Sequence, residues 1–333
     1  MREGAPHSDT RPSVAVVGAG MSGLACAQAL APHAKVRVFD KSRGVGGRLS
    51  TRYAGAYEFD HGAQYFTARN PHFQAFVAEA ITAGVVTPWD SRALYLRADG
   101  VEPDRGGARY VGTPRMNALP KWMAEGVSIE TAARVASITT DGGHTLHFED
   151  GSTQSGFSAT VLAIPAPQAT LLLPQDFAER EAVETADLAP CFALMVGLDA
   201  KHDFDVDTLR VESLPVDWIA VNSHKPGRPD GATTLMIHAS AAWSRAHVDD
   251  DRADVESELL AVASDLLFTD LRGAPHTALH RWLYSSVATP AGVEHLWDPA
   301  SRIGACGDWC PGGRVEGAYL SGLTLARTII DTL

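Results

Sequence analysis

Three glycines and one aspartate near the start of the chain have the spacing of a dinucleotide-binding turn. Gly18, Gly20 and Gly23 form a GxGxxG motif, and Asp40 follows Gly20 by twenty residues. In such turns the first glycine makes the bend, the second lets the backbone approach a pyrophosphate, and the third lets a helix pack closely on a strand. A carboxylate at the position of Asp40 accepts hydrogen bonds from a ribose. The motif predicts a dinucleotide site without distinguishing FAD from NAD; glycines with a purely structural role are the alternative.

The surrounding residues predict the strand, turn and helix that this motif needs. Residues 14–17 are a short apolar run rich in β-branched side chains, typical of a buried parallel strand. Residues 24–31 have the small side chains of a closely packed helix, and a second strand over 35–39 ends at Asp40. The free N–H groups and the positive dipole end of the helix favour phosphate at the turn.

The bulk composition limits the class of protein. The chain has 333 residues, of which 45% are hydrophobic and 20% are charged, and its formal net charge is −12. The length allows one large core or two joined cores, and the negative charge argues against nucleic-acid binding. Residues 1–12 are polar and do not resemble a signal peptide. We therefore expect a disordered leader, no membrane segment and a cytoplasmic protein.

The four cysteines do not suggest a disulfide framework or a metal centre. Cys306 and Cys310 have a loose metal-like spacing, but no second pair completes a site. We expect no metal.

Two further stretches carry residues suited to an anionic cofactor. The loop 41–48 follows Asp40 and combines glycines with two arginines, which favour close backbone approach to phosphate charge. A solvated basic turn is the alternative. Near the C-terminus a short strand ends at Asp308, before a helix predicted over 315–333. That acid could contact a ribityl chain or a phosphate, or it could simply cap the helix.

The order of predicted elements indicates two packed units. Residues 134–139 and 145–148 form a predicted hairpin, because Asp141-Gly142-Gly143 is a strong turn signal between them. From about 170 to 290, apolar strands surround one clear helix with few β–α–β alternations. We predict an α/β fold, in which a Rossmann-like domain carries a parallel sheet with a β-meander and an α+β substrate domain carries an antiparallel sheet. The cofactor domain is expected over 13–85, 116–168 and 295–333, and the substrate domain over 86–115 and 169–294.

Three separated stretches agree with one family. GAGMSG with Asp40, GVGGR with DHGAQYF, and ACGDW with RVEGAYLSG resemble the FAD-binding set of the flavin amine oxidase superfamily. Within it, DKSRGVGGRLSTR, DHGAQYFTAR, IPAPQ, HRWLY and CGDWCPGGRVEGAYLSG are most similar to the renalase family, particularly its bacterial members. The resemblance covers nearly the whole chain after residue 12.

The resemblance implies a non-covalently bound FAD and a role for individual residues. The pyrophosphate would be held by Ser22 and the glycines, and the adenosine ribose by Asp40. Val135 would contact adenine through its backbone. Arg48 would lie along the phosphates or the ribityl chain. The complete set of expected cofactor contacts is Gly18, Gly20, Met21, Ser22, Gly23, Asp40, Lys41, Gly47, Arg48, Gly62, Ala63, Gln64, Tyr65, Val135, Asp308, Val315 and Glu316.

The resemblance also places residues around the flavin ring. Gln64 and Tyr65 would lie near the isoalloxazine, and Asp308 at the ribityl–phosphate region. The helix start at Val315-Glu316 would point at the pyrimidine edge, where its dipole stabilises negative charge on the reduced ring. On the substrate side, the expected catalytic positions are His238 and Trp282. For His238, a histidine satisfied within its sheet is the alternative.

The activity implied by the resemblance is oxidation of misreduced nicotinamide dinucleotides, the 2- and 6-dihydro isomers of NAD(P)H. The hydride would move to flavin N5, and O₂ would reoxidise the flavin to give H₂O₂. A dihydropyridine that loses hydride becomes an aromatic cation with no proton to remove, so positioning and electrostatics should suffice. We accordingly find no nucleophile–base constellation. The expected partners are a small dinucleotide substrate and O₂, with no nucleic acid and no membrane; oligomeric state is not predicted.

Two other functions stay open. An amine oxidase would usually carry a lysine near flavin N5 and an aromatic cage; Lys201 and Lys225 lie in polar, loop-like contexts, and Trp309 lacks a clear tyrosine partner before it. A flavin-bound protein that senses or scaffolds without turnover is the second alternative. Arg228 and Arg245 could bind substrate phosphates or be solvated surface charges.

Overall fold

Strand β1 (Ser13–Val17) lies inside a six-stranded sheet, and four of its five residues are buried. The strand order is β19-β20-β13-β1-β2-β9, and every pair is parallel except β19 with β20. The other strands are β2 (Lys35–Phe39), β9 (Ser128–Glu130), β13 (Ala159–Leu162), β19 (Leu296–Asp298) and β20 (Ile303–Ala305). This computed structural model describes residues 10–212 and 214–332, so most of the leader predicted over 1–12 lies outside the described residues.

Alternate residues of β1 face two different layers. Val14 and Val16 pack in one core with helices α1 (Met21–Leu30) and α8 (Arg314–Ile330). Ala15 and Val17 pack in a second core with a three-stranded antiparallel meander. The meander consists of β10 (Val135–Thr139), β11 (His144–Phe148) and β12 (Thr153–Phe157). The sheet is therefore covered on both faces, as expected for parallel strands.

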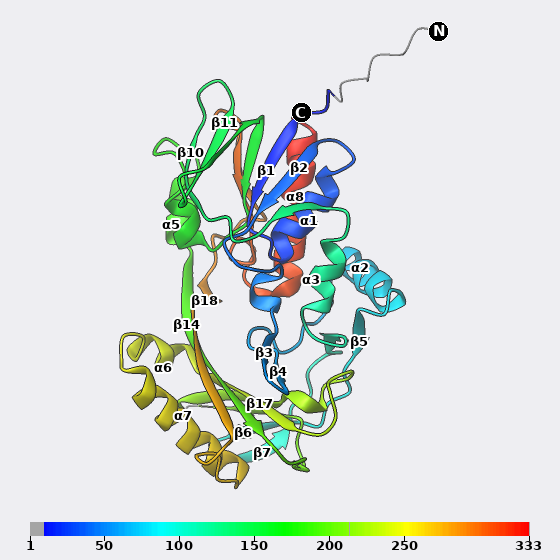
Figure 1. Ribbon diagram of the computed structural model, residues 1–333, viewed down its shortest axis with the longest axis vertical. Helices are drawn as coiled ribbons and strands as arrows, with labels where there is room; N and C mark the ends of the chain where they lie inside the picture. The colour runs from blue at the N-terminus through cyan, green and yellow to red at the C-terminus, as the bar shows by residue number, and fades with distance from the viewer. Residues whose placement is uncertain (1–9, 213, 333) are drawn as a thin grey trace.

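A second sheet of seven strands forms the other unit, which lies at the lower end of the molecule in Figure 1. Its order is β18-β14-β17-β16-β15-β6-β7, and it is antiparallel except for the parallel pair β6 with β15. Its strands are β6 (Ala93–Arg97), β7 (Gly100–Pro103), β14 (Asp187–Leu198), β15 (Thr208–Val211), β16 (Val216–Val221), β17 (Thr233–Ala239) and β18 (His276–Thr289).

The two faces of this second sheet have different partners. On one face Leu235 and Ile237 pack with α7 (Arg252–Leu267), near the short α6 (Ala241–Ala246). On the other face Met195 and Met236 pack with Phe59, from the hairpin of β3 (Arg52–Ala54) and β4 (Tyr57–Phe59). Strands β14 and β18 are the longest in the structure and run from the seven-stranded sheet toward the first unit (Figure 1).

The predicted fold class is confirmed, and the packing adds detail to the domain boundaries. Strands β6 and β7 join the seven-stranded sheet, but Val86 and Val111 at the two ends of 86–115 pack in the core of the first unit. Leu173 and Val183, from the predicted substrate domain, lie in the same core as the meander. The two-domain division itself stays a prediction.

The remaining helices and strands are short connecting elements or lie beside the two sheets. They are η1 (Gly47–Leu49), α2 (Pro71–Thr82), β5 (Val86–Pro88), β8 (Tyr110–Gly112), α3 (Ala118–Met123), α4 (Ala166–Thr170), α5 (Arg180–Thr185) and η2 (Asn222–His224).

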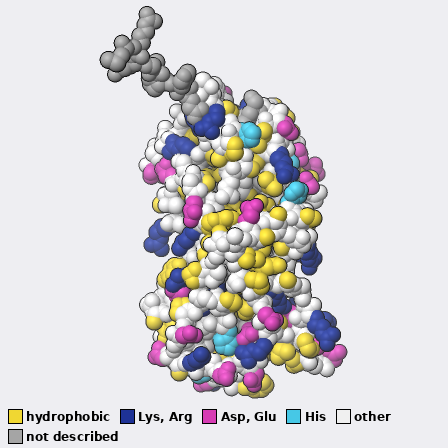
Figure 2. Space-filling view, turned by 90° about the vertical axis from the view of Figure 1, so that its right-hand side faces the viewer, with side chains coloured by type: hydrophobic (Ala, Val, Ile, Leu, Met, Phe, Trp, Pro, Cys, Tyr) yellow, Lys and Arg dark blue, Asp and Glu magenta, His cyan; other side chains and the backbone are white. Residues whose placement is uncertain are grey.

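The described surface mixes both signs of charge. On the face in Figure 2, Lys and Arg side chains are interspersed with Asp and Glu, and hydrophobic side chains gather near mid-height. Within 10–212 and 214–332, no helix has the length and apolar character needed to cross a bilayer. The same residues contain no group of three His, Cys, Asp or Glu side chains that could hold a metal ion.

Candidate functional site

The turn between β1 and α1 leaves room for an anion. Helix α1 begins at Met21 with no side-chain cap and no acidic residue in its first turn. No side chain of that turn therefore occupies the free N–H groups, which can bind an anion. A Cβ on Gly20 would meet no atom within 4 Å, whereas a Cβ on Gly23 would lie 1.9 Å from the carbonyl oxygen of Gly18. Gly23 is thus required by packing, and Gly20 keeps an open approach that fits a pyrophosphate.

Asp40 is held in place by the backbone on both sides. Its Oδ2 accepts from the N–H of Ala19 and its Oδ1 from the N–H of Ser42, each at 2.7 Å. Each carboxylate oxygen keeps a second lone pair for a ribose hydroxyl. The N–H of Ala133 donates to the carbonyl of Asp40 at 2.9 Å, which brings the start of β10 and Val135 to the same place.

The second glycine loop lies directly against the first. The N–H of Gly46 donates to the carbonyl of Ala19 at 2.8 Å, and the N–H of Ala63 donates to the carbonyl of Arg48 at 2.8 Å. The Arg48 guanidinium contacts both oxygens of Asp308, at 2.9 and 2.5 Å. The structure therefore brings together residues from four distant parts of the sequence, and these fit the phosphates and sugars of FAD.

Three residues expected to contact the cofactor use their side chains elsewhere. Lys41 Nζ donates to Gln168 Oε1 at 3.2 Å. Gln64 Nε2 donates to the carbonyls of Asp60 and Gly62, at 2.5 and 3.0 Å. Glu316 accepts from the N–H of Asn70 at 2.5 Å, at the start of α2. A cofactor contact from these residues would come from the backbone, or from the stem of Lys41.

A row of side chains crosses the sheet face that looks toward the first unit. Strand register places Trp218, His238, Ala193 and His280 side by side on β16, β17, β14 and β18. Trp282 follows two residues after His280, and its Nε1 donates to the carbonyl of His61 at 2.8 Å.

Ring contacts join the predicted catalytic positions to the turn after Asp60. His61 stacks on Trp282 with a centroid distance of 5.1 Å and meets His280 edge-on at 5.0 Å. Gln64 Nε2 lies 3.5 Å from His238 Nε2. His238 and Trp282 thus lie against the turn that carries the predicted isoalloxazine contacts.

The three imidazoles of this row and turn are uncharged at neutral pH. Burial lowers the pKa of His61 to about 3, with the neighbouring His280 acting in the same direction. Burial likewise lowers the pKa of His238 and of His280 to about 4 each, with further lowering from Lys225 and Arg52 respectively. Together with Trp218 and Trp282 they form an uncharged aromatic wall.

Sequence reasoning missed a buried ionic cluster behind the turn, formed by Asp60, Lys225 and Arg228. Lys225 Nζ lies 3.0 Å from Gln64 Oε1, 3.0 Å from Asn222 Oδ1 and 3.4 Å from Asp60 Oδ2. Arg228 donates to Asp60 Oδ2 at 2.5 Å. All three charged side chains are at least 98% buried. Lys225 does lie in a loop, directly after η2, but the tertiary fold closes over this loop and buries the side chain completely.

The charges in this cluster perturb one another. Burial alone would raise the pKa of Asp60, but Lys225 and Arg228 outweigh it and lower that pKa to about 2. Burial lowers the pKa of Lys225 to about 8, against the attraction of Asp60. Nothing in the sequence marks Lys225, since HKPGRPDG has the composition of a surface turn. For the wall, the sequence offered one signal, which is that His280 and Trp282 are two residues apart and so lie on the same face of a strand.

Three other sequence-based alternatives are decided by the structure. Trp309 is fully buried and its Nε1 donates to the carbonyl of Ile164 at 3.0 Å, so it is a core residue and not part of an exposed cage. Arg228 forms a buried ion pair with Asp60, so it is not a solvated surface charge. Arg245 forms an exposed ion pair with Asp187 at 2.8 Å.

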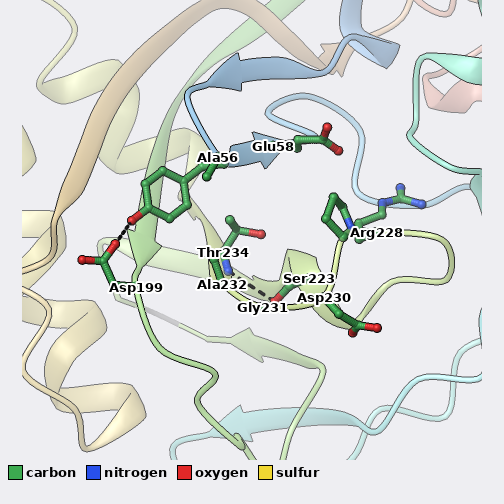
Figure 3. Close-up of a pocket in the computed structure, with 11 residues that line it drawn as sticks. Ala56, Glu58, Asp199, Ser223, Arg228, Asp230, Gly231, Ala232 and Thr234 are labelled. Atoms are coloured by element: carbon green, nitrogen blue, oxygen red, sulfur yellow. Dashed lines mark hydrogen bonds between the residues drawn. The ribbon is translucent and has the colours of Figure 1, made fainter.

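A separate cleft of about 330 Å³ lies beside β4 and the loop that follows η2. Tyr57 and Asp199 are hydrogen-bonded across it, and the guanidinium of Arg228 points away from it (Figure 3). None of the residues expected to contact FAD lines this cleft. It is distinct from the site formed by the glycine turns.

Comparisons with known proteins agree with this geometry. A family model for an NAD(P)-binding Rossmann-like domain matches residues 16–80, and one for flavin-containing amine oxidoreductases matches residues 89–330. The chain is similar to renalase from Mus musculus, with 24% identity over 309 residues that cover 83% of this chain and 85% of that protein.

Solved structures share the fold. A candidate protoporphyrinogen oxidase from Exiguobacterium matches with a TM-score of 0.79 and 13% identity, covering 98% of this chain and 100% of that one. Cyclohexylamine oxidase from Brevibacterium oxydans matches with a TM-score of 0.73 and 16% identity, covering 96% and 99%.

Proposed function

Because the chain belongs to the flavin-containing amine oxidoreductase family, we propose that this FAD-dependent enzyme oxidises the 2- and 6-dihydro isomers of NAD(P)H. Bound FAD would supply the chemistry of hydride acceptance and of two-electron reduction of O₂ to H₂O₂, with one proton taken from solvent. The oxidised product would be NAD(P)⁺. We further propose that FAD is held without a covalent bond, since the four cysteines are all buried and none is in a disulfide.

The observation that carries the substrate class is the uncharged aromatic wall. A dihydronicotinamide ring is flat and neutral, and it loses a hydride without losing a proton. Histidines with pKa values of about 3 and 4, lowered mainly by burial, are poor proton acceptors at pH 7, so His61 and His238 are suited to positioning and not to base catalysis. Trp282 is partly exposed and is backed by the buried His61, so it offers a flat face to a flat ring.

The protein groups would act mainly by holding the reactants. The unblocked start of α1 would bind the cofactor pyrophosphate, and Asp40 the ribose. The wall on β16, β17 and β18 would orient the substrate ring and exclude water from it. Loss of hydride from the substrate ring requires no proton to move on a side chain.

Oxidation of a small amine is the second candidate, and Lys225 is the observation that favours it. This lysine is buried beside Gln64, in the manner of the flavin-facing lysine expected of amine oxidases. However, an ammonium has three donors, and Gln64, Asn222 and Asp60 already occupy the surroundings of Lys225 Nζ. Little remains to hold a water molecule, so we rank this function lower.

Anaerobic stopped-flow absorbance of the yellow protein would test the proposal. The flavin band should bleach rapidly with one or both dihydro isomers, and slowly or not at all with ordinary NADH or a panel of primary amines. Bleaching by amines alone would replace the proposed function by amine oxidation. Bleaching by none of them would leave only the fold and the FAD site.

A further inference from the structure

The buried cluster behind the cofactor turn has more positive than negative charge. Within residues 10–212 and 214–332, Asp60 is the one carboxylate that forms ion pairs with Lys225 and Arg228. The other contacts of Lys225 are neutral amide oxygens and the ring of Trp89, 5.8 Å from Nζ. Arg228 otherwise donates to the carbonyls of Gly112 and Pro226. Removing a cation from water is unfavourable unless it is fully paired, so an excess of positive charge here needs a reason.

Lys225 also fixes the orientation of Gln64. The Gln64 Oε1 atom accepts from Lys225, and its Nε2 donates to the carbonyls of Asp60 and Gly62. The Nε2 end of the amide is thus bonded within the turn, and its Oε1 end is bonded to Lys225. Since Asn222 and Lys225 come from the second unit and Asp60 and Gln64 from the first, the cluster clamps the turn across the junction of the two units.

We propose that Lys225 is a positioning residue of the flavin site. It holds the Gly62–Tyr65 turn through Gln64, and it supplies an unbalanced positive charge that favours negative charge on the flavin ring. A low-dielectric surrounding makes such a charge effective over a longer range than in water. This inference requires bound FAD and is independent of the substrate proposed above.

Sulfite titration of the oxidised protein tests the charge directly, because sulfite adds to oxidised flavin as an anion and needs no substrate. Lys225→Met should weaken sulfite binding by about tenfold or more. Lys201→Met is the matched control, since Lys201 is an exposed lysine of the same half of the chain, and its sulfite affinity should stay within about twofold of wild type.

A second variant separates charge from structure. Asn222→Asp keeps the lysine and its hydrogen bond and adds a carboxylate at the atom that now lies 3.0 Å from Nζ, although it loses the hydrogen bond that Asn222 Nδ2 donates to the carbonyl of Glu58. It should also weaken sulfite binding, whereas a purely structural lysine would leave the affinity unchanged. Unchanged sulfite affinity in Lys225→Met or in Asn222→Asp would overturn the proposal. If Lys225→Met does not retain FAD, Asn222→Asp decides alone. Failure of the dihydro isomers to bleach the flavin would not affect this result.

Discussion

Asp60 balances two buried cations, so its removal is expected to be costly. Asp60→Asn would leave Lys225 and Arg228 without their carboxylate in a buried site. Breaking a buried pair in this way lowers the free energy of unfolding by about 3–5 kcal/mol. Urea denaturation with flavin absorbance and circular dichroism would measure it.

The matched control is an exposed ion pair. Glu102→Gln removes the partner of Arg97 at the surface, where both side chains are about half exposed. Its cost should be below about 1 kcal/mol. Equal effects of Asp60→Asn and Glu102→Gln would show that the buried cluster does not stabilise the fold.

The uncharged histidines make stability depend on pH. His61, His238 and His280 have folded pKa values of about 3, 4 and 4, lowered mainly by burial, below the ordinary value of 6.5. Between pH 4 and 6.5 the unfolded chain therefore binds protons that the folded chain does not, and stability falls as pH falls. Urea midpoints at pH 7, 6 and 5 should decrease in that order. The lowered pKa of Asp60, about 2, adds a further loss only below about pH 4.

A histidine substitution would assign this pH dependence. His280→Asn removes one of the three groups. The slope of the free energy of unfolding against pH should therefore become shallower, by an amount that corresponds to up to about one bound proton. An unchanged slope would mean that His280 is not kept neutral by the fold.

Among the elements, the β1–α1 turn allows steric and binding effects to be separated. Gly20→Ala adds a methyl group into space that is free of protein atoms, at a φ of −80° that alanine adopts easily. We expect a folded protein that has lost most of its FAD. Gly23→Ala would place its Cβ 1.9 Å from the carbonyl oxygen of Gly18 and should destabilise the fold itself.

Absorbance at the flavin band and thermal unfolding would distinguish these two outcomes. Gly273→Ala serves as control, since Gly273 also has open space around it but lies far along the chain from the turn. Full FAD content in Gly20→Ala would show that the pyrophosphate does not approach this glycine.

For the whole molecule, the cofactor should contribute to stability by mass action. FAD would contact both the start of the chain and Asp308 near its end, so it binds the folded state alone. At a free FAD concentration one hundred times Kd, the stabilisation is about 2.7 kcal/mol. The melting temperature should rise with added FAD in wild type and not in Gly20→Ala. Denaturation should release FAD into solution; yellow colour that stays with the precipitated protein would indicate a covalent bond.

The sequence by itself determined the local parts of this protein. The glycine spacing, the β-branched run and Asp40 identify the phosphate turn, because close approach of backbones requires glycine at fixed positions. Apolar runs and turn signals predicted strands β1, β2, β10 and β11, since burial and tight turns each require particular residue types at neighbouring positions. The family motifs in order predicted the flavin fold, which the structure and the comparisons confirm.

Only the tertiary structure decided which residues meet at the site. Asp60 and Lys225 are 165 residues apart, and the burial that perturbs both pKa values arises only when the two units close on each other. Trp218, His238 and His280 share a row because of strand register, which depends on pairings between distant strands. Long-range contacts of this kind leave no pattern in a single sequence. The segment that carries Lys225 and Arg228 therefore has the composition of a surface turn, although both side chains are buried in the folded protein.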